Sequence, residues 1–341
     1  MTAAGDVTLR RVYFTCRRCG VHAHALDQRL GVEGFVSPHA QRVLCAVGAE
    51  WSFERCARFL RDVAGLVVCD NTVRAACDHH GGKMRTWQRE DPEASRPFRA
   101  ATGDVEFQTD GTCVNTTGGW REVRLSIFAK RERGEPVVDL DGWDDPRLPS
   151  PHARVATAVV RSSAALGPQW RTAAARLGIK DAADLTVLAD GAKWIWAEVA
   201  KNLPGAAGVL DIFHASEHLH AAAVARGDKA GTTAWYERSR RTLLESGAAG
   251  VIAALGSEPE DATGLIGYLE PHRDHTAYRR RLAEGRSIGS GMVEGACKTA
   301  VGRRLKQTGA RWRLRRLERM AALCCLHYGD QFDAYWKKVA G

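Results

Sequence analysis

Residues 105–110, Val-Glu-Phe-Gln-Thr-Asp, alternate apolar and polar side chains and end on an aspartate that is followed by glycine. Residues 123–129, Val-Arg-Leu-Ser-Ile-Phe-Ala, also place an apolar residue at every second position. A period of two residues is typical of β-strands that have one covered face. The two stretches therefore predict neighbouring antiparallel strands, with Asp110 in the first of them.

Regular segments continue after this pair. The apolar residues 185–189 predict a strand that ends at Asp190, residues 194–202 a helix, and residues 209–213 another strand. Residues 153–165 are expected to be helical. Strands followed by alternating helices and strands are typical of a mixed sheet covered by helices. A chain of 341 residues, 45% of them hydrophobic, is long enough for two or three domains, and its predicted fold class is mixed α/β.

Three carboxylates stand beside glycine at predicted strand ends or helix starts. They lie in Gln108-Thr-Asp110-Gly-Thr, Leu188-Ala-Asp190-Gly-Ala and Ser290-Gly-Met-Val-Glu294-Gly. A carboxylate that holds Mg²⁺ must approach phosphate oxygens closely. An adjacent glycine has no side chain and so leaves room for this approach. One Asp-Gly pair is common in ordinary turns, so the prediction of a two-metal site depends on all three together. Adjacent strands can bring Asp110 and Asp190 to one point at the strand ends.

Glu294 is expected in a helix that begins near Ser290. The apolar face of this helix consists of Val293, Ala296, Cys297, Ala300 and Val301. Lys298 follows Glu294 by one helical turn and shares its side of the helix. This lysine is therefore placed to meet a phosphate or to pair with the carboxylate.

Residues 36–82 contain three short segments whose apolar residues have helical spacing, which predicts a helix-turn-helix. Asp70 or Asn71 is expected to cap the third helix. Asn71, Thr72 and Arg74 then lie at the end of that helix where a recognition helix meets base edges. A plain three-helix bundle is the alternative for the same pattern.

The polar residues 83–100, which include two prolines, are expected to form a linker to the following strands. The formal net charge of +9 has its basic excess near the C-terminus. The basic residues there are Arg303, Arg304, Lys306, Arg311, Arg313, Arg315, Arg316 and Arg319. Double-stranded DNA is the expected partner, with a solvated, charged helix as the alternative. Trp312, Leu314, Leu317 and Cys324 predict that one face of this segment packs.

The ten cysteines are scattered, which fits buried thiols in a reducing compartment better than a disulfide framework. Cys16-Arg-Arg-Cys19 has the spacing of one half of a tetrahedral zinc site, so residues 1–35 are expected to be a partial zinc-ribbon-like segment. Either His22 and His24 complete a Zn²⁺ site, or a second cysteine pair is missing. No signal segment and no apolar run of ~20 residues is present, so a soluble cytoplasmic protein without a membrane partner is expected.

Three other interpretations attach to individual residues. His214-Ala-Ser-Glu217-His218 fits the H-x-x-E-H signature of zinc peptidases, with Glu284 or Glu294 as a third ligand, but short patterns of this kind arise by chance. Cys113 has no evident histidine partner and is expected to be a packed thiol rather than a nucleophile. Trp194 and Trp196 either stack on an unpaired DNA base or pack within their helix.

The order Asp110, Asp190, Glu294 on this strand pattern resembles the DDE transposases of bacterial insertion sequences related to the Mutator-like group. The resemblance extends from about Ser37 to the C-terminus. It is most specific at residues 190–196, Asp-Gly-Ala-Lys-Trp-Ile-Trp, and at residues 289–295, Gly-Ser-Gly-Met-Val-Glu-Gly. Such a family implies DNA cleavage and strand transfer with two Mg²⁺ or Mn²⁺ ions. A catalytically inactive or domesticated DNA-binding protein is the alternative.

The resemblance also implies a ribonuclease-H-like core in two parts, residues 101–218 and 287–341, separated by a helical insertion at 219–286. The resemblance further implies that Asp110 is a ligand of both metal ions. Asp190 and Glu294 would each be a ligand of one ion. An Asp-x-x-His pair, matched by Asp211 and His214, would orient the site or the scissile phosphate.

The implied partners are the terminal repeats of an element and its target DNA, bound by a homodimer or higher oligomer that is associated with the nucleoid. Family members usually carry a longer N-terminal region, so this chain is expected to be shortened relative to them.

Overall fold

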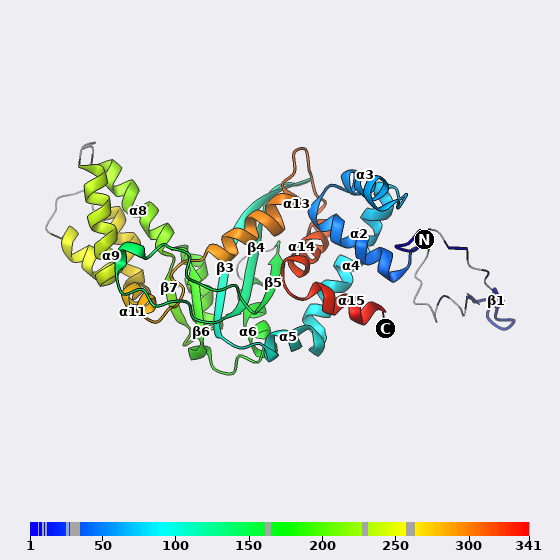
Figure 1. Ribbon diagram of the computed structural model, residues 1–341, viewed down its shortest axis with the longest axis horizontal. Helices are drawn as coiled ribbons and strands as arrows, with labels where there is room; N and C mark the ends of the chain where they lie inside the picture. Colours follow the sequence, from blue (N-terminus) through cyan, green and yellow to red (C-terminus); the bar gives the residue numbers. More distant parts are fainter. Residues whose placement is uncertain are drawn as a thin grey trace.

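The computed structural model describes every residue except 6, 9, 11, 25–26, 28–34, 161–164, 227–230, 257–262 and 341. A five-stranded sheet lies near the middle of an elongated molecule (Figure 1). The helices that precede the sheet in sequence lie at one end of the molecule together with the C-terminal helices, and the helices of residues 212–283 lie at the other end. The mixed α/β fold class is confirmed.

The sheet has the order β5-β4-β3-β6-β7. Its strands are β3 (Asp104–Thr116), β4 (Gly119–Arg131), β5 (Ala153–Val159), β6 (Leu185–Ala189) and β7 (Ala207–Leu210). β4 is antiparallel to both β3 and β5, whereas β6 runs parallel to β3 and β7 parallel to β6. The predicted antiparallel pair is confirmed, with Asp110 opposite Leu125.

The helix predicted for residues 153–165 is wrong in its first half. Ala153 to Val159 pair with Lys130 to Arg124 as the strand β5, and residues 161–164 lie outside the described part of the chain. The alanines of this stretch suit a helix, but its β-branched residues suit a pleated surface. Pairing with the long strand β4 decides between the two.

The segments after β5 follow the predictions more closely. β6 ends at Ala189, directly before Asp190, and α7 (Lys193–Asn202) follows. β7 is shorter than predicted, because it ends at Leu210 and Asp211 caps α8 (Ile212–Ala225). Ile212 and Phe213 are therefore helical instead of extended.

Helices cover both faces of the sheet. On one face, α6 (Gly167–Arg176) and α7 pack over Phe107 and Phe128. On the other face, α12 (Gly291–Ala296) lies against β3 and β4, and the π-helical turn η6 (Cys297–Gly302) lies against β3. The short helix α13 (Arg303–Leu305) follows η6 directly. The predicted apolar face of the Glu294 helix is buried at all five positions.

The N-terminal helices share a hydrophobic core with this second face. α2 (Pro38–Glu50), α3 (Phe53–Ala64) and α4 (Asp70–Glu90) pack with α14 (Leu314–Tyr328) and α15 (Phe332–Ala340). The three predicted helices are present. The predicted cap is wrong, since Cys69 is the N-cap residue of α4, makes no side-chain capping bond, and is followed by Asp70 as the first helical residue.

The linker predicted for residues 83–100 is wrong. α4 continues to Glu90, and the 3₁₀ turn η1 (Pro92–Ser95) and α5 (Arg96–Ala100) follow it directly. Met84, Trp87 and Phe98 are buried. Met84 and Trp87 extend the buried stripe of α4, and Phe98 is buried in α5, although most of the residues between them are polar.

The region predicted as a helical insertion is mainly helical in its described residues. It consists of α8, α9 (Thr232–Leu255), α10 (Thr263–Leu269), the 3₁₀ turn η5 (Glu270–His275) and α11 (Tyr278–Ala283). These helices form a core of their own with Leu188, Val209 and Leu210 of the sheet. These helices therefore pack against the C-terminal ends of β6 and β7.

Candidate active site

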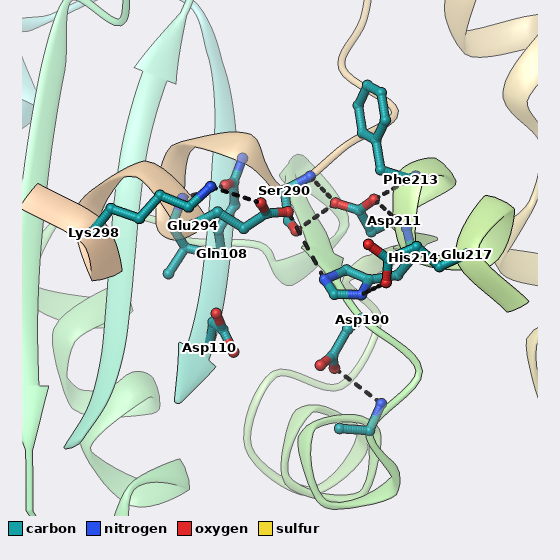
Figure 2. A network of polar contacts seen from close by, with 12 residues as sticks. Gln108, Asp110, Asp190, Asp211, Phe213, His214, Glu217, Ser290, Glu294 and Lys298 are labelled. Carbon is teal, nitrogen blue, oxygen red and sulfur yellow. Dashed lines mark hydrogen bonds and ion pairs between the residues drawn. The ribbon is translucent and has the colours of Figure 1, made fainter. Parts of the chain in front are cut away.

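Asp110 and Asp190 are brought together by the register of two parallel strands. Gln108 of β3 pairs with Leu188 of β6, and each aspartate follows its paired residue by two positions. Residues two apart on a strand share a face, so both carboxylates leave the sheet at the same level. Figure 2 shows the two carboxylates turned toward one another.

Glu294 approaches the aspartates from α12, which lies across β3. The backbone amide of Val293 donates a hydrogen bond to Oε1 of Gln108, with a distance of 3.0 Å. This bond fixes the start of α12 to the same strand face that carries Asp110. The three carboxylates predicted as a group thus come from the three expected elements and face one region (Figure 2).

The pKa of Asp110 is raised above its ordinary value, chiefly because the carboxyl group is buried and also because Asp190 carries a like charge nearby. A hydrogen bond of 2.6 Å from the amide of Gly111, the nearby His214 and the thiol of Cys297 act in the opposite direction. Crowding of two carboxylates in a partly buried position is an arrangement that a cation would relieve.

Asp211 joins the helix of His214 to the helix of Glu294. Its Oδ1 accepts hydrogen bonds from the amides of Phe213 and His214 at 2.6 and 3.1 Å, which caps α8. Its Oδ2 accepts hydrogen bonds from the amide and the hydroxyl of Ser290, directly before α12. Asp211 is fully buried, and its four hydrogen bonds hold the starts of α8 and α12 together.

His214 lies between two acidic side chains. Its Nε2 is 3.8 Å from Oε1 of Glu294, and its Nδ1 is 3.5 Å from Oε2 of Glu217. Lys298 approaches Glu294 from the opposite side, with 3.9 Å between Nζ and Oε2, and its side chain is 80% exposed. Glu294 is therefore flanked by two groups that can carry positive charge, as predicted for Lys298.

Tyr268 of α10 is a neighbour of the site that the sequence did not predict. A Cβ atom at Gly191 would lie 2.2 Å from its ring, so the ring occupies the space beside the backbone that follows Asp190. The Tyr268 ring also stacks on His218, with 3.7 Å between ring centroids. Burial, and then the charge of Asp190, raises its pKa, so the hydroxyl stays protonated. No local signal in the sequence links residues 191 and 268; glycine after Asp190 is the one hint of a close approach.

Lys306 is a second cation close to the carboxylates. Its ammonium group donates a hydrogen bond to the hydroxyl of Thr112, which stands two residues after Asp110 on the same strand. Lys306 was predicted as a DNA contact, and the structure places it beside the candidate site. Asp110, Asp190, Glu294, His214, Lys298 and Lys306 therefore form one constellation of three acids and three groups able to carry positive charge.

Oxygen donors of this kind suit Mg²⁺ or Mn²⁺ by their chemistry. Within the described residues, no three His, Cys, Asp or Glu side chains stand close enough to form a ready-made metal group. The fit therefore rests on the donor type, the shared strand register and the raised pKa of Asp110.

The two histidines of the H-x-x-E-H pattern have different neighbours in the structure. His214 faces Glu294, whereas His218 stacks on Tyr268, so the two histidines have separate partners. Trp196 packs, because its ring stacks on His275 at 4.2 Å and its Nε1 donates to the carbonyl of Asp190 at 2.7 Å. Trp194 lies under the guanidinium of Arg124. Helix packing is thus the observed role of Trp196.

The predicted DNA contacts fall into two classes. Asn71, Arg311 and Arg315 are exposed, Thr72 and Arg74 are partly exposed, and Arg303 pairs with Glu50 at 2.9 Å. Arg304 is buried, which makes its prediction as a DNA contact wrong for this conformation. Its Nε donates to the carbonyl of Gly48 at 2.6 Å, and its guanidinium lies over the rings of Phe53 and Trp312. Leu314, predicted to pack, is 49% exposed.

Cys16 and Cys19 are exposed at a tight turn between β1 (Phe14–Thr15) and β2 (His22–Ala23). Hydrogen bonds from the backbone of Cys19 and Arg18 lower the pKa of the Cys16 thiol, which favours the thiolate that a zinc ligand requires. The described part of this segment supplies no third ligand group, so zinc binding here stays a prediction.

Cys113 is exposed, and the expectation that it packs is wrong. Cys45, Cys56, Cys77, Cys297 and Cys324 lie in helical segments and are buried, in keeping with the expected buried thiols.

Comparison of the sequence with protein-family models and with curated proteins finds no match. Among the described helices, none combines the length and the apolar character that crossing a membrane requires.

Proposed function

We propose that this protein is a DDE-type transposase that cleaves and joins DNA strands with divalent metal ions at Asp110, Asp190 and Glu294. The observation that carries the proposal is the strand register: Asp110 and Asp190 each stand two residues beyond the paired residues Gln108 and Leu188. The helix of Glu294 is held against the same strand by the hydrogen bond from Val293 to Gln108. A five-stranded mixed sheet whose first three strands are antiparallel is compatible with the ribonuclease-H-like core that the sequence resemblance implies.

Mg²⁺ or Mn²⁺ held by these carboxylates would supply charge stabilisation for the attacking and leaving oxygens of a phosphodiester. Asp110 and Asp190 would hold the ions from the sheet, and Glu294 would close the group from α12. Asp211 keeps Glu294 and His214 in place, because one carboxylate fixes the starts of both helices.

Positive side chains around the carboxylates would orient the DNA backbone. Lys306 lies beside Thr112 on β3, and Lys298 is exposed next to Glu294. Both can donate to phosphate oxygens as the strand passes the carboxylates. His214 would orient Glu294 through the contact at 3.8 Å.

The proposal is tested by nicking of supercoiled DNA, and by cleavage of DNA that carries the element's own ends, in Mg²⁺ and in EDTA. We expect nicking in Mg²⁺ alone and a loss of at least about a hundredfold in Asp110→Asn, Asp190→Asn and Glu294→Gln, since each removes several kcal/mol of charge stabilisation. Asp333→Asn, which alters an exposed surface pair with Arg42, is the matched control. Equal nicking in all four variants would refute the assignment.

A DNA-binding protein without catalysis is the second candidate. The exposed side chains of Asn71, Arg311 and Arg315 favour it, because they can contact DNA without the carboxylates. Salt-dependent DNA binding combined with no metal-dependent nicking by the wild-type protein would support it.

A further inference from the structure

The turn between β3 and β4 carries a strongly exposed tryptophan. Thr116 pairs with Gly119 across a two-residue loop, and the hydroxyl of Thr116 donates to the carbonyl of Gly119 at 2.5 Å. Trp120 follows immediately, and 66% of its surface is exposed. Single exposed aliphatic residues are common on proteins, but an indole at the tip of a rigid hairpin is a large apolar surface without cover.

This hairpin is anchored to the basic C-terminal segment. The amide of Thr117 donates to the carbonyl of Trp312 at 2.9 Å, and the amide of Trp312 donates to the carbonyl of Asn115 at 3.1 Å. The Trp312 ring is buried against Arg304 and Phe53. The tip of the hairpin and the loop before α14 therefore form one projection, at the upper edge of Figure 1.

The projection has an excess of positive charge, and Glu122, which follows Arg121, pairs with Arg124. Residues 113–121 and 295–317 contain no Asp or Glu. Arg121, Arg311 and Arg313 are exposed, and none of them forms an ion pair with a described residue. Basic residues that carry no acidic partner beside an exposed aromatic ring are the combination that binds single-stranded nucleic acid, through phosphate contacts and base stacking.

The same projection continues the strand that carries Asp110. Lys306 and Thr112 lie between Asp110 and the tip, so one positive side chain stands along β3 between the carboxylates and the projection. Thr116 stands six residues beyond Asp110, which is about 20 Å of antiparallel strand at ~3.4 Å per residue. This length corresponds to about six nucleotides of duplex DNA at ~3.4 Å per step.

We propose that the projection formed by Trp120, Arg121, Arg311 and Arg313 binds the DNA flank about six nucleotides from the cleaved phosphodiester, with Trp120 stacked on an unpaired base. The arginines contact the phosphates on either side of that base. The position relative to the cleaved bond rests on the proposed function, whereas binding of an unpaired DNA strand by the projection does not.

The test is equilibrium binding of two labelled DNAs in EDTA, where no cleavage takes place. One DNA is a blunt duplex, and the other is the same duplex with a single-stranded extension. Trp120→Ala is expected to weaken binding of the extended DNA about fivefold or more, since stacking of one base on an aromatic ring is worth ~1–3 kcal/mol. Trp120→Phe keeps a flat ring and is expected to restore most of the affinity.

The charge contribution is measured from the salt dependence of the same binding. Arg121→Gln and Arg311→Gln are each expected to reduce the slope of log K against log salt by about 0.7 to 0.9 for each phosphate that the variant no longer binds. Arg171→Gln, which alters an exposed arginine of α6 on the other face of the sheet, is the matched control and should leave the slope unchanged.

Equal affinity of Trp120→Ala and the wild-type protein for the extended DNA would overturn the proposal. An equal loss of affinity for blunt and extended DNA would overturn the assignment to an unpaired base. If the same duplex is given an RNA extension instead, a loss of affinity confined to that substrate would overturn the assignment to DNA. Failure of the proposed function looks different: the wild-type protein would then cut no DNA in Mg²⁺, while Trp120→Ala would still bind the extended DNA more weakly.

Discussion

Asp110 and Asp190 stand in register on two parallel strands, each two residues beyond the pair formed by Gln108 and Leu188. Their like charges oppose one another in a partly buried position, and burial together with Asp190 raises the pKa of Asp110. Ionisation of Asp110 therefore destabilises the metal-free protein.

Asp110→Asn is expected to raise the melting temperature of the metal-free protein at neutral pH while it abolishes DNA cleavage. A carboxyl group whose pKa is raised on folding stabilises the protein below its unfolded pKa of 3.8, and this stabilisation is lost as the pH rises through the folded value. The advantage of the variant should thus be present at pH 7 and disappear below pH 3.8. Thermal unfolding in EDTA at both pH values is the measurement, and an equally stable or less stable variant at pH 7 would contradict the account.

The raised pKa also predicts how cleavage depends on pH. At subsaturating Mg²⁺ the ion must displace the proton from Asp110 of the metal-free protein, so activity should begin to fall at a pH above that at which an ordinary aspartate protonates. A pH–rate profile with the midpoint of its acid limb at or below 3.8 would show that Asp110 is not the group that limits activity.

Asp211→Ala is expected to destabilise the protein by about 2–4 kcal/mol. The change removes the cap of α8, which is worth ~1 kcal/mol, and leaves the buried amide of Ser290 without its acceptor, which costs ~1–3 kcal/mol. Ser290→Ala removes only one of the donors and should cost about 1 kcal/mol. Urea unfolding measures both; a loss for Asp211→Ala no larger than that for Ser290→Ala would argue against the double role of Asp211.

Gly191→Ala is expected to destabilise the protein by about 1–3 kcal/mol, because the new methyl group would collide with the ring of Tyr268. The collision should be relieved in Gly191→Ala combined with Tyr268→Ala. A double-mutant cycle of unfolding free energies is expected to give a favourable coupling for this pair. Additive effects would mean that Tyr268 does not hold the backbone after Asp190.

Arg304 and Arg311 belong to one basic run but are expected to respond differently to substitution. Arg304→Leu removes a buried hydrogen bond to Gly48 and two cation–π contacts, and we expect a loss of about 2–4 kcal/mol in unfolding free energy with an unchanged salt slope of DNA binding. Arg311→Gln should reduce the salt slope of DNA binding and leave the unfolding free energy unchanged. A reduced salt slope for Arg304→Leu in the folded protein would place Arg304 at the DNA.

Periodicity was enough to predict much of the fold. The alternation in residues 105–110 and 123–129 identified β3 and β4, and the apolar run before Asp190 identified β6. It failed where two structures have similar local preference, as in the alanine-rich β5, which is extended because β4 offers it a pairing edge. It also failed for residues 83–100, where a few buried side chains, among them Met84, Trp87 and Phe98, outweigh many polar ones.

The candidate site was predictable at its carboxylates and less so around them. Asp110, Asp190 and Glu294 carry a local signal, since each is followed directly by glycine. Tyr268 comes from a helix far along the chain, and only the tertiary fold brings it to Gly191. Arg304 looks like its basic neighbours in sequence, and its burial depends on the packing of α3 against the loop before α14.

The central claim is that Asp110, Asp190 and Glu294 together bind divalent cations, and Mn²⁺ binding in the presence of bound DNA tests it most directly. Electron paramagnetic resonance of free Mn²⁺ would give the affinity of the wild-type protein, Asp190→Asn and Glu294→Gln, with Mg²⁺ as competitor. The account predicts Mn²⁺ binding that Mg²⁺ displaces and that weakens by at least about tenfold in each variant. No Mn²⁺ binding by the wild-type complex, or the same affinity in all three proteins, would contradict it.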